Sequence, residues 1–395
     1  METYFLDLHV HIGKDSQGRP VKITASPQLT LPNILKECLE KKGIDLVGVV
    51  DCGTYGVLAD LEEMLLKGEL LALKKGGWRY RDKITLFAGM ELETIEKEGG
   101  RAHYLCFFPH LDKLKDFSHY IWTKVKNKFL SSQVCYLTAV QLLKEVEKRD
   151  GLFIPAHVFT PYKSLYGNCA VSLKDVFGRE ANKIKVIELG LSADRKMALL
   201  LPELRDKFFL ANSDAHSLDN IGREYNQVAI DSPTFKGLMD LFAGKSGKLI
   251  ANYGLDPQLG KYHRSFCQRC NCSLLAKPPQ LFCSKCGTSE QFVIGVLDRI
   301  VSVAEKQVNE KNVDTVEGTY LYQVPLKFLP GIGKVTLEKL LAEFGTEMRV
   351  LQQVSFEDLA KIVGAKLAAL IIKSRQGTLK IIPGGGGIYG KIDQS

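Results

Sequence analysis

The sequence lacks any apolar run of about 18 residues, the length that a membrane-spanning helix needs. It also lacks the uninterrupted apolar segment of a secretory signal, because Asp7, His9 and His11 fall inside the first apolar stretch. We therefore expect a cytoplasmic protein with no membrane partner. The chain has 395 residues, 45% of them hydrophobic and 25% charged, which is ordinary for a globular protein of two or three domains.

Positive charge is concentrated in the C-terminal third of the chain. Residues 1–260 hold 35 Lys and Arg against 33 Asp and Glu, whereas residues 261–395 hold 18 against 12. Such an excess indicates a polyanionic partner. A solvated basic surface would explain the same excess equally well.

The first 258 residues alternate short apolar runs with amphipathic helical stretches, a pattern typical of parallel strands joined by helices. We therefore predict an α/β domain over residues 1–258. The predicted strands are Tyr4–His11, Asp45–Asp51, Ile84–Glu91, Ala102–Phe108, Leu152–His157, Lys185–Leu189 and Phe208–Asn212.

Two smaller parts follow. Residues 259–318 are predicted to form a cysteine-rich module with a helix over Val293–Glu305 and a polar linker over 306–318. Residues 319–395 are predicted to be all-helical, with helices over Val335–Phe344 and Phe356–Ser374 on either side of Gly345. The glycine-rich tail that begins at Pro383 is expected to hold no regular structure.

Ionisable residues stand at the ends of the predicted strands. In a barrel of parallel strands these ends share one face, where active sites are built. His9 and His11 are two residues apart on a strand and point to one side, as Asp214 and His216 do. Mixed imidazole and carboxylate ligands favour a centre with more than one metal ion. The predicted set is His9, His11, Asp51, Glu91, His157, Glu188, Asp214 and His216.

Four of these segments resemble the polymerase and histidinol phosphatase (PHP) family: Asp-Leu-His-Val-His at 7–11, Gly-Met-Glu at 89–91, Pro-Ala-His at 155–157 and Ser-Asp-Ala-His at 213–216. The resemblance implies a distorted (β/α)7 PHP barrel, a centre of two or three divalent metals (Zn, Mn or Mg) and hydrolysis of phosphate esters. Where many members have Thr-Asp-His, this chain has Val50-Asp51-Cys52, so only Asp51 is carried over as a ligand.

Longer stretches are similar to the endonuclease Q subgroup of that family. They are Pro-Ala-His-Val-Phe-Thr-Pro-Tyr at 155–162, Glu-Leu-Gly-Leu-Ser-Ala-Asp at 188–194 and Ile-Gly-Arg-Glu at 221–224. The resemblance adds His103 as a further metal ligand. It implies a DNA repair endonuclease that cuts on the 5′ side of deaminated bases (hypoxanthine, xanthine, uracil) and at abasic sites.

Five of the ten cysteines gather between Cys267 and Cys286, and in a chain without an export signal they indicate metal rather than disulfides. Cys267 and Cys270 form one pair with two residues between them, and Cys283 and Cys286 form a second. This is the spacing of a zinc ribbon, in which four thiolates hold a structural Zn ion. Cys272 is an alternative to Cys270, although it breaks the symmetric spacing.

The segment Phe328–Lys334 resembles the hairpin of a helix-hairpin-helix DNA-binding domain. Gly331 and Gly333 allow a tight turn that exposes backbone amides at a helix N-terminus, and Lys334 adds positive charge. Such a hairpin would hold the DNA backbone without reading sequence. A plain helix-turn with glycines is the alternative. A weaker second copy of the motif is predicted over Leu359–Ile371.

A pocket for the damaged base is predicted in the loop after His157, formed by Phe159, Tyr162, Tyr166 and Asn168. Packing of these residues against the barrel is the alternative. Two other functions remain open from the sequence: a PHP-type phosphoesterase acting on a small phosphorylated metabolite, and a non-enzymatic DNA-binding module. A clamp or other repair-protein partner cannot be read from the residues.

Overall fold

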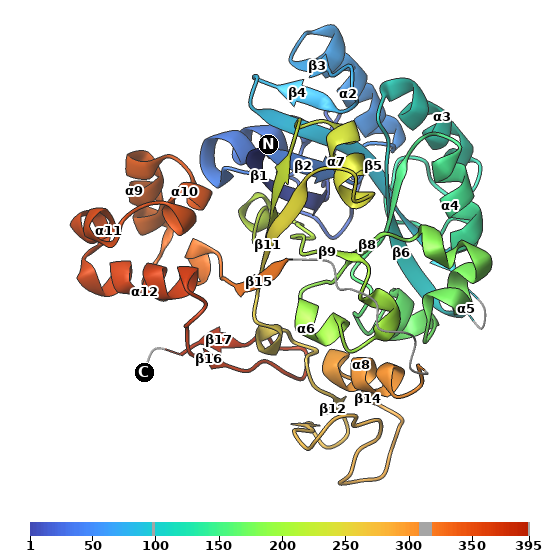
Figure 1. Ribbon diagram of the computed structural model, residues 1–395, viewed down its shortest axis with the longest axis vertical. Helices are drawn as coiled ribbons and strands as arrows, with labels where there is room; N and C mark the ends of the chain where they lie inside the picture. Colours follow the sequence, from blue (N-terminus) through green and yellow to red (C-terminus); the bar gives the residue numbers. More distant parts are fainter. Residues whose placement is uncertain (97–98, 308–317, 394–395) are drawn as a thin grey trace.

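The computed structural model describes residues 1–96, 99–307 and 318–393. A barrel of strands surrounded by helices forms the body, a small β-module projects from one end of it, and a helical lobe lies at one side (Figure 1). Within the described ranges, no helix has the length and apolar character needed to cross a bilayer.

All seven predicted strands are present. They are β1 (Glu2–Val10), β2 (Leu46–Val49), β5 (Ile84–Ile95), β6 (Arg101–Phe107), β7 (Leu152–Pro155), β8 (Val186–Glu188) and β9 (Phe208–Leu210). Strands β1, β2 and β5 are parallel neighbours, as are β8 and β9. Further strands of this sheet were not predicted. The strands β10 (Tyr225–Ile230) and β11 (Lys248–Gly254) pair antiparallel beside β1, and β4 (Trp78–Tyr80) and β3 (Leu70–Ala72) continue the sheet beyond β5. The mixed α/β barrel is confirmed.

Strand β6 corrects the prediction of an all-parallel barrel. It pairs antiparallel with both β5 and β7, and residue Glu93 lies opposite His103. Only residues 96–100 separate β5 from β6, which is too short for the crossover that a parallel pair requires. Because β6 runs in reverse, its beginning lies beside the carboxyl ends of its neighbours, and His103 is brought to that face.

Alternation along β1 separates the core from the polar face. Leu6 and Leu8 join a buried cluster with Phe235 and Leu238 of α7 (Phe235–Phe242). The intervening Asp7 and His9 are also fully buried, and successive side chains of a strand point to opposite sides. The strand thus supports the core and the site at once.

The helices around the barrel begin and end at residues that favour caps. Thr138 and Gln141 form a capping box at α4 (Ala139–Glu147). Thr30 caps α1 (Leu31–Glu37), which continues as the π-helix η1 (Cys38–Lys42) and ends at Gly43, where φ is 78°. The others are α2 (Tyr55–Leu66), α3 (Leu111–Trp122), α5 (Leu173–Phe177) and α6 (Arg195–Ala198).

The cysteine-rich module is a three-stranded sheet of β12 (Phe266–Cys267), β13 (Cys272–Ser273) and β14 (Phe292–Val293). Helix α8 (Val296–Ala304) follows and is anchored to the barrel by Arg299, whose Nε donates to the carbonyl of Tyr166 at 2.7 Å. Of the predicted linker, residues 308–317 lie outside the described residues. Strand β15 (Thr319–Tyr322) then pairs parallel with β11 and extends the barrel sheet.

The C-terminal part contains α9 (Lys334–Phe344), α10 (Glu347–Gln352), α11 (Phe356–Val363) and α12 (Ala365–Arg375). The single helix predicted over Phe356–Ser374 is wrong, because Gly364, at φ 80°, separates α11 from α12. The glycine-rich tail also differs from the prediction of no regular structure. There β16 (Ile381–Ile382) and β17 (Lys391–Ile392) pair antiparallel, and the amides of Gly384 and Gly390 donate to carbonyls of the segment after β11.

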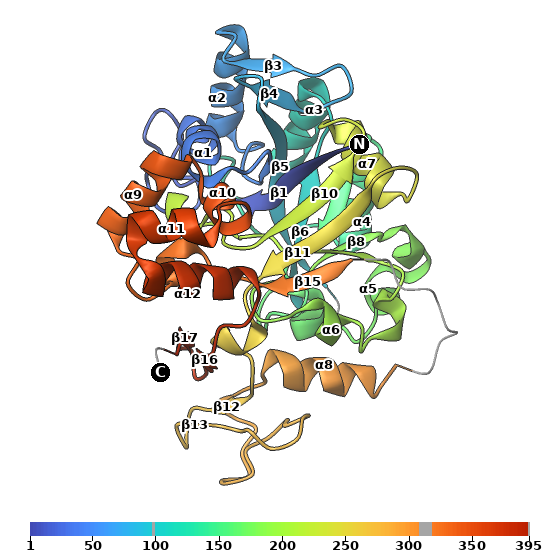
Figure 2. The same cartoon turned by 60° about the vertical axis from the view of Figure 1, so that its left-hand side comes forward.

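A buried ion pair fixes the helical lobe to the barrel. The ammonium of Lys42 lies 2.7 Å from the carboxylate of Glu347 in α10 and donates to the carbonyl of Asp219 at 2.8 Å. Lys327, just before α9, donates to the side chain of Asn220 at 2.7 Å. Figure 2 shows α10 close to α1 on this side of the barrel. The loop that contains residues 219 and 220 is therefore held from the helical lobe.

Candidate metal centre

The first group of candidate ligands is His9, His11 and Asp214. The Nε2 atoms of His9 and His11 are 3.3 Å apart, and one carboxylate oxygen of Asp214 lies 3.5 Å from the first and 3.3 Å from the second. Both imidazoles are fully buried at the carboxyl end of β1. Asp214 adopts a φ of 44°, a left-handed conformation that is uncommon outside glycine but is tolerated by Asp more readily than by most residues.

Two buried carboxylates orient these histidines from behind. Nδ1 of His9 donates to Glu188 at 3.0 Å, and Nδ1 of His11 donates to Asp51 at 3.1 Å. When Nδ1 donates to a carboxylate, the lone pair of the neutral imidazole lies on Nε2, where it can bind a metal. Two such lone pairs that face one another beside a carboxylate form a binding site for a cation.

The second group is Glu91, His103 and His157. One oxygen of Glu91 lies 2.8 Å from Nδ1 of His103 and 3.4 Å from Nε2 of His157. The other oxygen lies 3.6 Å from Nε2 of His11 in the first group. Glu91 therefore stands between the two groups and can be shared by ions bound in each.

The electrostatics keep the carboxylates ionised. Burial opposes their charge, but neighbouring cationic groups hold the pKa of Glu91 and of Asp214 well below the ordinary range. Burial likewise opposes the protonated form of His9, yet Glu188 and Asp214 together raise its pKa well above the usual value, and a metal ion bound at Nε2 would take the place of that proton. The donor set of imidazole nitrogens and ionised carboxylates fits divalent metals.

Asp51 and His216 occupy different positions from the other predicted ligands. Asp51 faces Nδ1 of His11 and also accepts from the amide of Ile12 at 2.7 Å, so it lies on the far side of the imidazole from Asp214. His216 donates from Nδ1 to the carbonyl of Asp214 at 3.0 Å, and its ring centre is 4.6 Å from that of His11. His216 is the more accessible of the two, with a side chain 30% exposed.

Several neighbours of the centre were not predicted. Lys22 places its ammonium 2.9 Å from Glu91, and Ser132 makes a hydrogen bond to the same oxygen. Glu93 holds Nε2 of His103 at 3.0 Å. Lys22 and Ser132 lie in loops without a recognisable motif, so no sequence pattern pointed to them. Glu93 could have been found from the two-residue spacing to Glu91 on one strand.

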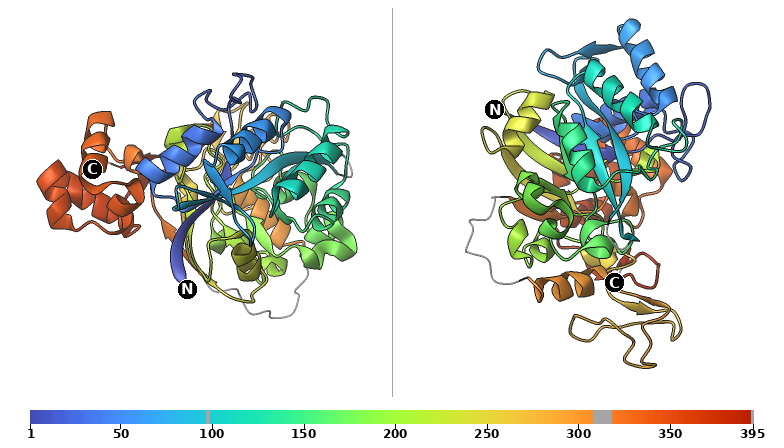
Figure 3. Two further views of the ribbon diagram at one scale, coloured as in Figure 1. Left: turned by 90° about the horizontal axis from the view of Figure 1, so that it is seen from above. Right: turned by 90° about the vertical axis from the view of Figure 1, so that its right-hand side faces the viewer.

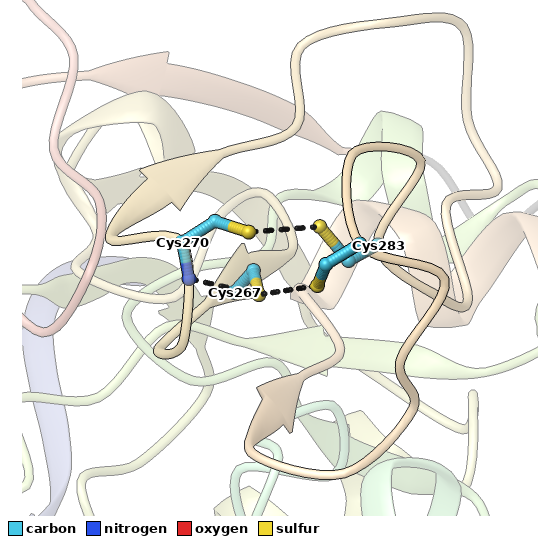
Figure 4. A group of neighbouring side chains, drawn as sticks. Cys267, Cys270 and Cys283 are labelled. Atoms are coloured by element: carbon cyan, nitrogen blue, oxygen red, sulfur yellow. Dashed lines mark hydrogen bonds between the residues drawn. The ribbon is translucent and has the colours of Figure 1, made fainter.

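The four cysteines of the β-module converge as the spacing predicts. The sulfur of Cys267 lies 3.8 Å from that of Cys286, and the sulfur of Cys283 lies 3.8 Å from that of Cys270 (Figure 4). Zn–S bonds of about 2.3 Å in a tetrahedron place sulfur atoms about 3.8 Å apart. Cys272 lies outside this group of four. The geometry fits a closed, structural zinc site.

The predicted hairpin lies between a single 3-10 turn, η8 (Leu326–Phe328), and α9. Gly331 has a φ of 89°, so the turn needs glycine there, whereas Gly333 has ordinary backbone angles and open space around it. Lys334 is exposed, with a side chain 89% accessible. The second predicted copy takes the form of α11, Gly364 and α12.

The four residues predicted for a base pocket separate into two kinds. Phe159 and Tyr166 are buried and stack on one another at 5.4 Å between ring centres, so both belong to the core. Tyr162 is 55% exposed, and Asn168 is also exposed. Only these two can touch a base without rearrangement of the core.

Known proteins match this chain over nearly its whole length. The YqxK protein of Bacillus subtilis is 45% identical over 395 residues, covering 99% of this chain and all of the relative. A PHP-associated family model matches residues 195–243.

Two solved structures share the architecture. The lesion-specific endonuclease PfuEndoQ from Pyrococcus furiosus is 31% identical with a TM-score of 0.82, covering 99% of this chain and 95% of that one. An endonuclease Q in complex with a 27-mer duplex substrate with an abasic lesion at the active site is 31% identical with a TM-score of 0.81, covering 99% and 96%. Since barrel, ribbon and helical lobe all fall inside these alignments, the chain belongs to the endonuclease Q family of PHP proteins.

Proposed function

We propose that this chain is a metal-dependent DNA repair endonuclease that hydrolyses the phosphodiester on the 5′ side of hypoxanthine, xanthine and uracil, and at abasic sites. The observation that carries the proposal is the pair of ligand groups, His9–His11–Asp214 and Glu91–His103–His157, joined through Glu91. The related endonuclease Q bound to a duplex with an abasic lesion supports DNA as the substrate.

Divalent ions held by these groups would supply Lewis-acid charge neutralisation and would lower the pKa of water at the reacting phosphate. The protein's own part is to fix the ligands. Glu188 and Asp51 set the protonation of His9 and His11, and the ammonium of Lys22 adds positive charge where a phosphate would enter.

A cavity of about 320 Å³ lined in part by the loop that follows His157 is the proposed pocket for the base. It lies between the loop after His157 and the zinc ribbon, and this volume is at the lower end of small-molecule pockets, roughly 300–1,000 Å³. Thr160 lies 3.4 Å from Nδ1 of His157, so the loop is in direct contact with a candidate ligand. The lining residues are Phe159, Pro161, Tyr162, Gly167, Asn168, Phe292, Val293, Ile294 and Arg299.

The chemistry of this cavity suits deaminated bases. Deamination replaces an exocyclic amine with a carbonyl and places a hydrogen on the adjacent ring nitrogen. The side-chain oxygen of Asn168 accepts from the amide of Arg101 at 2.8 Å, which leaves the amide NH₂ group of Asn168 to donate to a base carbonyl. The exposed ring of Tyr162 offers a stacking face.

The decisive experiment uses end-labelled duplexes, each with one hypoxanthine, xanthine, uracil, abasic or normal nucleotide, incubated with Mn²⁺, Mg²⁺ or Zn²⁺. We expect a single cut 5′ to each lesion that depends on added metal. Equal cutting of the undamaged duplex would refute the repair function. Hydrolysis of a small phosphate monoester without any DNA cutting would favour the metabolite phosphoesterase instead.

Tyr162→Ala tests the pocket itself. Stacking on an aromatic side chain is worth about 1–3 kcal/mol per base, so cutting at hypoxanthine and uracil should slow roughly 5- to 150-fold. Cutting at an abasic site, which has no base to stack, should change little. Tyr162→Phe keeps the ring and serves as the matched control. Equal losses on all substrates would place the pocket elsewhere.

A further inference from the structure

The loop after α3, residues 123–134, holds positive charge without acidic partners. Its sequence contains Lys124, Lys126 and Lys128 and neither Asp nor Glu. Among the described residues, no carboxylate lies within ion-pair distance of any of these three ammonium groups. Lys126 and Lys128 are exposed. Three lysines without an ion pair within five residues concentrate positive charge at one place, which suits a polyanionic partner outside the chain.

Aromatic rings hold Lys128 in place of an acid. Its ammonium lies 3.9 Å from the ring centre of Tyr55, and the rings of Trp122 and Phe129 are within 5.7 Å of the same ammonium. The Tyr55 ring in turn packs against Trp122 at 5.4 Å and Phe129 at 5.1 Å. Cation–π contacts of this kind orient a lysine while leaving its full charge uncompensated.

Hydrogen bonds fix the loop to the metal centre. The amide of Tyr55 donates to the carbonyl of Lys128 at 2.9 Å, and the amide of Ser131 donates to the carbonyl of Val21 at 3.1 Å. Ser132 bonds to Glu91 and accepts from Lys22 at 2.5 Å. The lysines are thus carried on a chain segment that touches a candidate metal ligand.

We propose that Lys124, Lys126 and Lys128, oriented by Tyr55, form a second contact with the DNA backbone, separate from the helical lobe. Helices α9–α12 and the end of α3 lie on opposite flanks of the barrel when seen from above (Figure 3, left). A duplex with its cleaved bond at the metal centre would then be held on both sides of that bond. This inference rests on the proposed function, because the polyanion it names is the proposed substrate.

The salt dependence of binding gives the expected size of the effect. Each phosphate neutralised by a lysine contributes about 0.9 to the slope of log affinity against log salt concentration. Replacing all three lysines with glutamine should therefore lower the slope by about 2 to 3. At 0.15 M salt the loss of two or three such contacts weakens binding roughly 30- to 170-fold.

The experiment measures fluorescence anisotropy of an undamaged labelled duplex across a salt series, with the full chain carrying Lys124→Gln, Lys126→Gln and Lys128→Gln. The control carries Lys74→Gln, Lys75→Gln and Lys245→Gln, three exposed lysines of which the first two lie in the turn between β3 and β4 and the third just before β11. We expect the reduced slope in the loop variant alone. Equal slopes for the two variants would overturn the proposal.

The ring of Tyr55 gives an independent readout. Tyr55→Leu should lower the slope by about 1, because Lys128 loses its orientation, whereas Tyr55→Phe should match the wild type. A slope unchanged by Tyr55→Leu would remove the ring from the contact. Nicking of an abasic duplex by the wild-type protein is scored separately. If nicking fails while the slopes differ as expected, the proposed function falls and the DNA contact stands.

Discussion

Replacing Asp51 with asparagine tests whether this residue orients His11 or binds metal itself. Asp51 is fully buried and accepts from Nδ1 of His11 at 3.1 Å and from the amide of Ile12 at 2.7 Å. One oxygen of Asp51, Oδ2, accepts both bonds, and the other lies 3.3 Å from Nδ1 of His11. In the variant, the amide oxygen must take the Ile12 N–H, so the NH₂ group replaces the oxygen at 3.3 Å. The imidazole then faces a neutral amide in place of the carboxylate charge that favours a proton on Nδ1.

The size of the effect follows from the loss of the carboxylate charge behind His11. Loss of a hydrogen-bonding partner behind a metal ligand typically costs 10- to 100-fold in metal affinity, or about 1.4 to 2.8 kcal/mol. Glu188→Gln makes the corresponding change behind His9 and should have a similar effect, since Glu188 lies 3.0 Å from Nδ1.

The assay is calorimetric titration of metal-depleted protein with Mn²⁺, paired with nicking of an abasic duplex over a range of metal concentration. We expect Asp51→Asn to bind the same number of ions more weakly and to recover activity at raised metal. Unchanged affinity would refute the orienting role. Loss of one ion per chain at every concentration would show that Asp51 is a ligand, as the sequence predicted.

Three further changes test other parts of the molecule. Cys283→Ser should release the ribbon zinc while Cys272→Ser retains it, as measured by metal analysis of purified protein; equal zinc content would remove the assignment. Gly331→Ala should cost roughly 1–2 kcal/mol of unfolding free energy because its φ is 89°, whereas Gly333→Ala, at ordinary angles, should not. Burial raises the pKa of Glu224 to about 8, so its contribution to stability is present below about pH 4.5 and is lost as the pH rises to about 8. Thermal unfolding should show Glu224→Gln more stable than wild type at pH 9, by up to about 5 kcal/mol of unfolding free energy, and not at pH 5.

The sequence predicted the parts of the fold that depend on local pattern. Apolar runs located the seven strands, and the paired cysteines located the ribbon, because both signals lie within a few residues. The direction of β6 was missed because its apolar pattern is the same for either direction of pairing. The break at Gly364 was missed because a lone glycine is tolerated inside helices and its φ of 80° is set by the packing of α11 on α12.

The candidate site was predictable where ligands repeat a spacing. His9 with His11 and Asp214 with His216 stand two residues apart, and the structure brings these pairs together. Lys22 could not be found this way, because its contact with Glu91 joins residues 69 positions apart through an irregular loop. Phe159 and Tyr166 were placed in a pocket since aromatic residues suit base stacking, but the same side chains serve equally well as core.

The ion pair between Lys42 and Glu347 links residues 305 positions apart and also fixes the carbonyl of Asp219, five residues after Asp214. Lys327 fixes the neighbouring residue from the same lobe. The barrel therefore depends on the helical lobe for part of its structure. A truncated chain ending before α9 would lose Glu347 and leave the ammonium of Lys42, which holds the carbonyl of Asp219, without its buried partner, so the helical lobe also supports the segment that follows Asp214. Exchange of helical lobes between relatives would have to preserve this lysine and its carboxylate together.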